Sequence, residues 1–259
     1  MKKLILILTI SMVFILLYSC EKDATGIDPG MARLNIYITD APAVYESVKI
    51  TFSTVSAHID SEWVTVSGEP TTVDLLKWTN GEKLLLGSAD VPAGKYTQIR
   101  LIIDDAEIGV DSEVHPLEVP SGAKTGLKFG PQFTVEEGFT YELVFDFDVS
   151  RSIVVTGPKK NPHGYKLKPH IRMIATAVSG SISGIVTNPA DVPVAYAILG
   201  NDTVTTSFVD TTSGFFRLAF LPDTVYTVSI VDTNDLRFDQ SDVSVMSGMD
   251  NDLGMITLE

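Results

Sequence analysis

Cysteine and basic residues are scarce in this sequence, and both shortages restrict what the protein can be. Its 259 residues contain one cysteine, which excludes an internal disulfide framework and a cysteine-rich zinc site. Lysine and arginine total 19 against 33 aspartates and glutamates, so the formal net charge is −14. Nucleic-acid binding needs a basic surface that neutralises phosphates, and this composition argues against it. With 44% apolar and 20% charged residues, the chain is typical of one large or two medium globular domains.

Helical periodicity is also missing, because no segment carries an apolar stripe over three helical turns. Apolar and polar residues alternate instead, as in Leu34–Thr39, which is the pattern of a half-buried strand. Residues 54–66 predict a hairpin with a polar turn at Asp60-Ser61-Glu62. Only Leu75–Trp78 and Glu82–Ser88 look locally helical. The sequence therefore predicts an all-β protein.

The first nineteen residues predict a targeting signal rather than part of the fold. The apolar run Leu4–Tyr18 spans about 15 residues, whereas a membrane-spanning helix needs roughly 20. It ends in Leu17-Tyr18-Ser19-Cys20, which resembles the bacterial lipobox. The resemblance implies that residues 1–19 are a lipoprotein signal peptide, cleaved between Ser19 and Cys20. It also implies that Cys20, the only cysteine, is acylated.

Residues 20–31 then form a polar tether behind the acylated cysteine. The expected partner of the chain is the membrane, reached through the lipid at Cys20. We expect the protein at the outer membrane of a Gram-negative bacterium, facing the periplasm or the cell surface. A secretory signal, or an uncleaved anchor that happens to end in cysteine, is the alternative.

The remaining chain divides near residues 175–180, where bulky residues give way to small ones. Beyond this point, short apolar segments alternate with turn residues at a spacing of about 8–12, which is typical of a β-sandwich. We therefore expect two consecutive antiparallel β-sandwich domains, residues 32–178 and residues 179–259, behind the cleaved signal peptide and the short tether.

A series of short motifs marks residues 32–177. They are, in order, Thr39-Asp40-Ala41-Pro42, Trp63, Val73-Asp74-Leu75-Leu76, Pro92-Ala93-Gly94-Lys95-Tyr96, Val119-Pro120-Ser121-Gly122, Phe145-Asp146-Phe147-Asp148 and Leu167-Lys168-Pro169. In this order they resemble a bacterial lipoprotein domain family of unknown function. That resemblance implies a fold and a setting, but no activity.

A second set of motifs marks residues 180–259. They are Gly184-Ile185-Val186, Pro193-Val194-Ala195, Asp210–Gly214 with Phe215-Phe216, Tyr226-Thr227-Val228, and the closing Leu253, Gly254, Ile256 and Leu258. They resemble the carboxypeptidase regulatory-like modules, small sandwiches grouped with carbohydrate-binding-like folds. Tyr196 departs from the motif, which usually has a small residue there. The resemblance implies a spacer or packing module, since fold alone does not license sugar binding.

Asp146 and Asp148 are the strongest candidates for chemistry, because they share one face of a predicted strand about 6–7 Å apart. That spacing suits a glycosidase pair or a shared cation. Alternatively, Lys166, Lys168 and Arg172 lie on a neighbouring strand, predicted over residues 165–173, and form a structural charge ladder with these acids. We favour the ladder.

Two surfaces are candidates for binding. The loop that contains Lys159, Lys160 and His163 is cationic in an otherwise acidic protein, and it could contact an anionic glycan or a partner protein. Trp63 and Trp78 could stack on sugar rings if they are exposed.

We find no catalytic constellation, no convincing metal site and no need for a cofactor. His58, Asp60 and Glu62 do not share a face, and the acidic stretch 232–242 lacks the spacing of a calcium loop. The sequence thus favours a non-enzymatic cell-envelope lipoprotein that acts as a binding or structural spacer protein, with a protein or glycan partner. A glycan-binding accessory protein is the alternative, and a glycan hydrolase that uses Asp146 and Asp148 ranks third.

Overall fold

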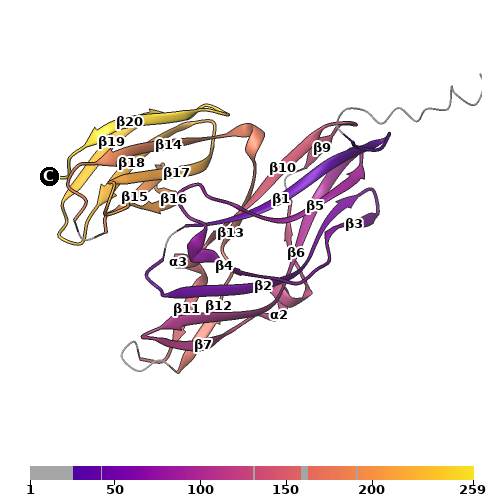
Figure 1. Cartoon of the computed structure of the whole chain (residues 1–259), viewed down its shortest axis with the longest axis horizontal. Helices are drawn as coiled ribbons and strands as arrows, with labels where there is room; N and C mark the ends of the chain where they lie inside the picture. Colours follow the sequence, from indigo (N-terminus) through magenta and orange to yellow (C-terminus); the bar gives the residue numbers. More distant parts are fainter. Residues whose placement is uncertain (1–25, 42, 131, 159–162, 191) are drawn as a thin grey trace, which may run out of the picture.

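The computed structural model describes residues 26–41, 43–130, 132–158, 163–190 and 192–259 (Figure 1). Two hydrophobic cores divide these residues into a first unit, from β1 to β13, and a second unit, from β14 to β20. No described helix is long and apolar enough to cross a membrane.

The described residues form twenty strands and four short helical segments. In the first unit they are β1 (Met31–Ala41), β2 (Ser47–Ile59), β3 (Glu62–Ser67), β4 (Thr71–Asp74), η1 (Leu75–Lys77), β5 (Leu84–Pro92), β6 (Gly94–Val110), β7 (Glu113–Glu118), α2 (Ser121–Thr125), β8 (Leu127–Phe129), β9 (Phe133–Val135), β10 (Thr140–Asp148), α3 (Val149–Ser152), β11 (Ile153–Thr156), β12 (Gly164–Leu167) and β13 (Ile171–Ala175). The short helical segment η2 (Thr176–Val178) connects the two units. The second unit contains β14 (Ser179–Val186), β15 (Val194–Leu199), β16 (Asp202–Phe208), β17 (Phe215–Pro222), β18 (Val225–Val231), β19 (Arg237–Ser244) and β20 (Asp250–Ile256).

The first unit packs two sheets around one core. The four-stranded sheet has the order β13-β10-β1-β5, and the larger sheet has the order β11-β12-β7-β6-β2-β3, with β4, β8 and β9 paired at its sides. β1 supplies the clearest pattern, because Leu34, Ile36 and Ile38 are fully buried while the residues between them are partly exposed. Period-two alternation thus places one face of β1 in the core. Phe145 and Phe147 of the neighbouring β10 fill that same core.

The second unit is a smaller pair of sheets, with the orders β17-β14-β20 and β16-β15-β18-β19. Its core contains Phe216, Leu218, Tyr226 and Val228, all essentially unexposed. Gly214 precedes β17 with a positive φ of 74°, and a Cβ there would lie 2.1 Å from the Val186 carbonyl oxygen. Only glycine fits this turn.

The all-β fold is confirmed, and the hairpin at residues 54–66 forms as β2 and β3. Three pairings are parallel rather than antiparallel: β1 with β10, β7 with β12 and β14 with β20. The helical interpretation of Glu82–Ser88 is wrong, because most of this segment belongs to β5 and pairs with β1. Of Leu75–Trp78, residues 75–77 form a 3₁₀ turn.

The single strand predicted over residues 165–173 is also wrong. The chain forms β12 in the larger sheet, leaves it near Pro169, and enters the four-stranded sheet as β13. Proline lacks the N–H that a continuous interior strand would need at this point.

Candidate functional site

Asp146 and Asp148, at the end of β10, are both engaged by neighbouring groups. Asp146 faces Arg172 across the β10–β13 pair, and Arg172 Nε lies 2.5 Å from its Oδ2. The Asp146 side chain is only 7% exposed. Asp148 caps α3, where its Oδ1 accepts hydrogen bonds from the Arg151 N–H at 3.1 Å and from Ser150 Oγ at 2.6 Å. Both acids therefore have structural partners in the fold.

The part of the predicted ladder that involves the two lysines is wrong. Lys166 lies on β12 in the other sheet, and its Nζ is 3.0 Å from Glu118 Oε2. Lys168 lies in the connection after β12, where its backbone N–H donates to the Ser152 carbonyl. Because residues 165–173 divide between two sheets, only Arg172 of the three basic residues reaches Asp146.

These acids lie where the two units meet, because they line a cavity together with Val204 and Thr205 of the second unit. From the first unit, Arg172 donates through Nη2 to the Ala219 carbonyl of the second at 3.4 Å. Ser207 Oγ, in the second unit, donates to Asn80 Oδ1 in the first. Gly81 sits against the second unit, and a Cβ there would lie 3.0 Å from Arg217 Cδ. Two hydrogen bonds and the close approach of Gly81 therefore connect the units.

The cavity that Asp146 and Asp148 line together is too small for a sugar, whereas a larger cleft of about 470 Å³ is lined by Asp148 without Asp146. The smaller cavity has a volume of about 30 Å³ and is also lined by His170, Arg172 and Thr205. One water molecule needs about 10–15 Å³ of such space, so the cavity has room for roughly two or three waters. Glycoside hydrolysis at these two acids would require room for a sugar ring between them.

Asp40 is an interface residue that the sequence analysis missed. It is 5% exposed, and its burial raises the pKa of its carboxyl well above the ordinary value, with the negative charges of Asp146 and Asp148 adding to the effect. The Val149 N–H donates to its Oδ1 at 3.0 Å and opposes this rise. A signal was present, because Asp40 continues the even-numbered, core-facing series of β1.

Two buried polar atoms at this interface have no hydrogen-bond partner among the described residues: Asp40 Oδ2 and Arg217 Nε. Both residues line one cavity of about 10 Å³ between the units. Such a cavity is close to the smallest that can hold one water molecule, which could satisfy both groups.

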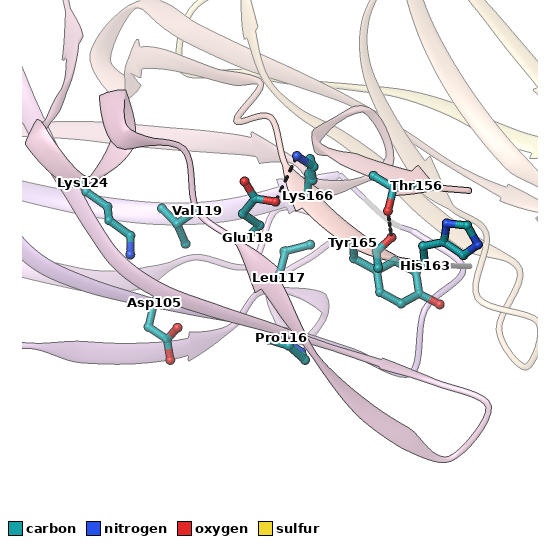
Figure 2. Close-up of a pocket in the computed structure, with 11 residues that line it drawn as sticks. Asp105, Pro116, Leu117, Glu118, Val119, Lys124, Thr156, His163, Tyr165 and Lys166 are labelled. Carbon is teal, nitrogen blue, oxygen red and sulfur yellow. Dashed lines mark hydrogen bonds and ion pairs between the residues drawn. The ribbon is translucent and has the colours of Figure 1, made fainter. Parts of the chain in front are cut away.

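A more open cleft lies in the first unit, where β7 and β12 pair (Figure 2). Its volume is about 410 Å³, and its lining includes Asp105, Lys124, His163, Tyr165 and the ion pair of Lys166 with Glu118. His163 of the predicted cationic loop therefore lines a real cleft. Lys159 and Lys160 lie outside the described residues.

The two tryptophans lie in different surroundings. Trp78 packs against the core of the first unit, and its carbonyl accepts hydrogen bonds from the Asp40 N–H at 2.8 Å and from Thr39 Oγ1 at 3.0 Å. Trp63 lies on β3, with the Arg100 guanidinium 4.4 Å from its ring centroid. No ring contact joins the two tryptophans in the part of the chain that the structure describes, so they do not form one platform.

Among the described residues, no group of three or more His, Cys, Asp or Glu side chains could hold a metal ion. Ser19 and Cys20 lie outside the described residues, so acylation of Cys20 stays a prediction.

A family model described as a domain of unknown function (DUF4382) matches residues 31–169, more than half of the chain. No curated protein matches the chain.

Several solved structures resemble the fold at low similarity. The Bacillus anthracis TIE protein is 11% identical over 88% of this chain and 34% of its own, with a TM-score of 0.25. A fimbrial protein from Bacteroides ovatus is 12% identical over 89% of this chain and 50% of its own, with a TM-score of 0.23. BcpA, the major pilin subunit of Bacillus cereus, is 9% identical over 88% of this chain and 70% of its own, with a TM-score of 0.21. The chain thus spans about a third and a half of the first two, and at these TM-scores none of the three bears on function.

Proposed function

The chain belongs to the family defined by the domain of unknown function DUF4382, and from this premise we propose that it is a non-enzymatic cell-envelope lipoprotein that acts as a structural spacer. The observation that carries the proposal is the set of contacts that Asp146 and Asp148 make. The two acids that best fitted a catalytic pair instead hold Arg172 and cap α3 at the junction of two β units. Of these residues, Arg172 is the one that also bonds to the second unit, through the Ala219 carbonyl.

A spacer must hold the parts that it separates at a fixed distance, so the two units should keep one relative orientation. The contacts across the junction support this, because backbone, amide, hydroxyl and guanidinium groups of both units take part. In this proposal the second unit, residues 179–259, is a carboxypeptidase regulatory-like packing module, as its motifs suggest. Polar contacts of this kind fix geometry more than they add stability.

Replacing Gly81 by leucine is expected to separate the two units. Gly81 has a φ of 86°, and a side chain there would press on Arg217 and Ala219. Gly200→Leu is the matched control, since Gly200 has a φ of 63° and no atom lies within 4 Å of its Cβ position. Both variants bear similar backbone strain, and only Gly81→Leu meets the other unit.

The measurement is a spin-label distance between the units. With Cys20 changed to serine, single cysteines at the exposed Val114 and Met255 report one distance between the units. We expect one narrow distance distribution for the parent and for Gly200→Leu, and a broad one for Gly81→Leu. A broad distribution in the parent would contradict the spacer proposal.

Anchoring is proposed through an acylated Cys20 at the outer membrane of a Gram-negative bacterium. Cys20→Ala is expected to abolish fatty-acid labelling in a Gram-negative host. The chain should then remain as the uncleaved 28.1 kDa precursor, because cleavage of a lipoprotein signal follows acylation of the cysteine. Ser19→Gly keeps a small residue before the cysteine and should still be labelled and cleaved. Normal processing of Cys20→Ala would instead favour a secretory signal.

Glycan binding is the second candidate function, and Trp63 favours it. Its indole lies on the solvent-facing side of β3 beside cationic groups, whereas Trp78 is packed against the core. Since the Arg100 guanidinium lies over this ring, Trp63 would contribute to a glycan site by holding the cation in place.

A further inference from the structure

Arg100 and Lys128 are neighbouring cations in this acidic protein. Most described lysines and arginines have a carboxylate partner, such as Arg33 with Asp90 and Lys83 with Glu142. Within the described residues, Arg100 and Lys128 have none. Because the chain carries a net charge of −14, carboxylates that could pair with them are abundant elsewhere on the chain. Their lack of a partner leaves local positive charge for an external anion.

The backbone brings these two cations side by side on one face of the larger sheet. Arg100 on β6 is directly opposite Lys128 on β8, and on its other side Arg100 is opposite Ser56 on β2. Trp63 extends from β3, the next strand, and its ring contacts both cations, at 4.4 Å for Arg100 Cζ and 5.8 Å for Lys128 Nζ. Four adjacent strands therefore build one patch.

The guanidinium of Arg100 is held in place from two directions. Its Nε donates to Ser56 Oγ at 3.3 Å, and its Cζ lies over the Trp63 ring. Gly126 leaves room for it, since a Cβ there would be 2.7 Å from Arg100 Cγ and Cδ. No described residue accepts a hydrogen bond from its two terminal nitrogens. Their N–H groups are therefore available as a preorganised fork for a carboxylate or sulfate.

Two acids on the same strands are directed or held away from these cations. Glu62 precedes Trp63 on β3, so its side chain projects to the opposite face. Asp104 is on the same face of β6, but it is four residues from Arg100, about 13 Å along the strand, and it accepts a hydrogen bond from Ser53.

The shape and polarity of the surroundings favour a polymer of sugars. The patch lies on an open sheet face and none of its residues lines a described cavity, whereas sites for small molecules are concave. Its neighbours His58, Thr97 and Gln98 offer polar groups that can bond to hydroxyls. Within the part of the chain that the structure describes, none of these neighbours lines one of the five best-formed cavities, which are the kind of site that the side-chain anchors of a peptide use.

We propose that Arg100 and Lys128, with Trp63 as the residue that positions Arg100, bind the anionic groups of an acidic polysaccharide. This inference rests on the glycan-binding candidate function and is independent of the anchoring and spacer proposals. The shared chemistry is a carboxylate or sulfate on a sugar chain.

The test is isothermal titration of the full chain, in neutral detergent, with four probes of similar length. They are an oligogalacturonate, a chondroitin sulfate oligosaccharide, maltohexaose and hexaglutamate. We expect binding to one or both acidic glycans, which identifies the anion as carboxylate or sulfate, and none to maltohexaose or hexaglutamate. The affinity should fall with added salt.

Three variants assign the binding to the patch. Arg100→Gln is expected to weaken binding by at least about 10-fold and Lys128→Gln by about 3-fold, while Arg100→Lys falls between the parent and Arg100→Gln because it keeps the charge without the fork. Lys95→Gln is the matched control, since Lys95 is an exposed lysine without an ion pair on the same strand, and it should bind as the parent does. Lys128 is exposed, so Lys128→Gln tests the site even if an Arg100 variant folds poorly.

Several outcomes would overturn the proposal. Binding of hexaglutamate as strong as that of the acidic glycans would mean an acidic peptide site, and equal losses for Lys95→Gln and Lys128→Gln would mean general charge attraction. Binding of maltohexaose would retain glycan binding and reject the anion site. No binding to any probe would reject both, and would leave the spacer proposal as it stands.

Discussion

Replacing Arg172 by methionine is expected to lower the free energy of unfolding by about 3 kcal/mol. The change would leave the Asp146 carboxylate, whose side chain is 7% exposed, without the cation that lies 2.5 Å away. Breaking a buried ion pair from one side costs about 3–5 kcal/mol, and the lower end applies because Arg172 retains 25% exposure. The loss of the hydrogen bond to Ala219 should also loosen the second unit. Urea unfolding at pH 7 measures the effect.

Two further variants distinguish the effect of the unpaired Asp146 carboxylate from a general loss of stability. Adding Asp146→Asn to Arg172→Met removes the unpaired charge and should restore a large part of the loss. Arg33→Met removes an ion pair of similar length, 2.8 Å, whose side chains are 37% and 28% exposed, and should cost less than about 1 kcal/mol. Equal losses for Arg33→Met and Arg172→Met would show that burial of Asp146 does not govern the energetics.

Replacing Asp40 by asparagine is expected to stabilise the protein at neutral and alkaline pH. Burial is the largest cause of the raised pKa of Asp40, so the folded state binds this proton more tightly than the unfolded state does. The wild-type free energy of unfolding should therefore fall as pH rises above the ordinary value of 3.8 and through the raised folded value. Asparagine keeps the oxygen that accepts from the Val149 N–H and has no proton to lose.

The comparison is best made by urea unfolding at several pH values between 4 and 8. The variant and the wild type should have similar stability near pH 4, and the variant should gain on the order of 1–3 kcal/mol at pH 8. The charged groups around Asp40 are Asp146, Asp148 and Arg217. Asp202→Asn, at an exposed position, is the control and should show no such pH dependence. A gain that is constant with pH would mean that Asp40 does not titrate in this range.

The strand pattern of the core could be predicted because alternation is a local property. Spacing alone predicts a buried face of β1, made by Leu34, Ile36 and Ile38. The same rule failed at Glu82–Ser88, where a run of leucines resembles a helix turn until its pairing with β1 is known. It also failed after Leu167, because period two continues across Pro169 while the chain changes sheets.

The candidate site was less predictable, because its partners are distant in sequence. Trp63 could be named as a stacking residue, but its contact with Arg100 and Lys128 depends on the strand order β3-β2-β6-β8. Asp146 was recognised as a structural acid, and Arg172 rather than a lysine proved to be its partner.

By itself the sequence determined the all-β class, the acidic character of the chain and the residues of the core, because these depend on composition and on short-range periodicity. Only the tertiary structure decided which charges meet. An ion pair such as Asp146–Arg172 or a stack such as Arg100 on Trp63 needs strands brought together from 26 to 37 residues apart. Strand order and register determine these contacts, because a shift of one residue in the pairing register would turn each side chain of a strand to the other face of the sheet.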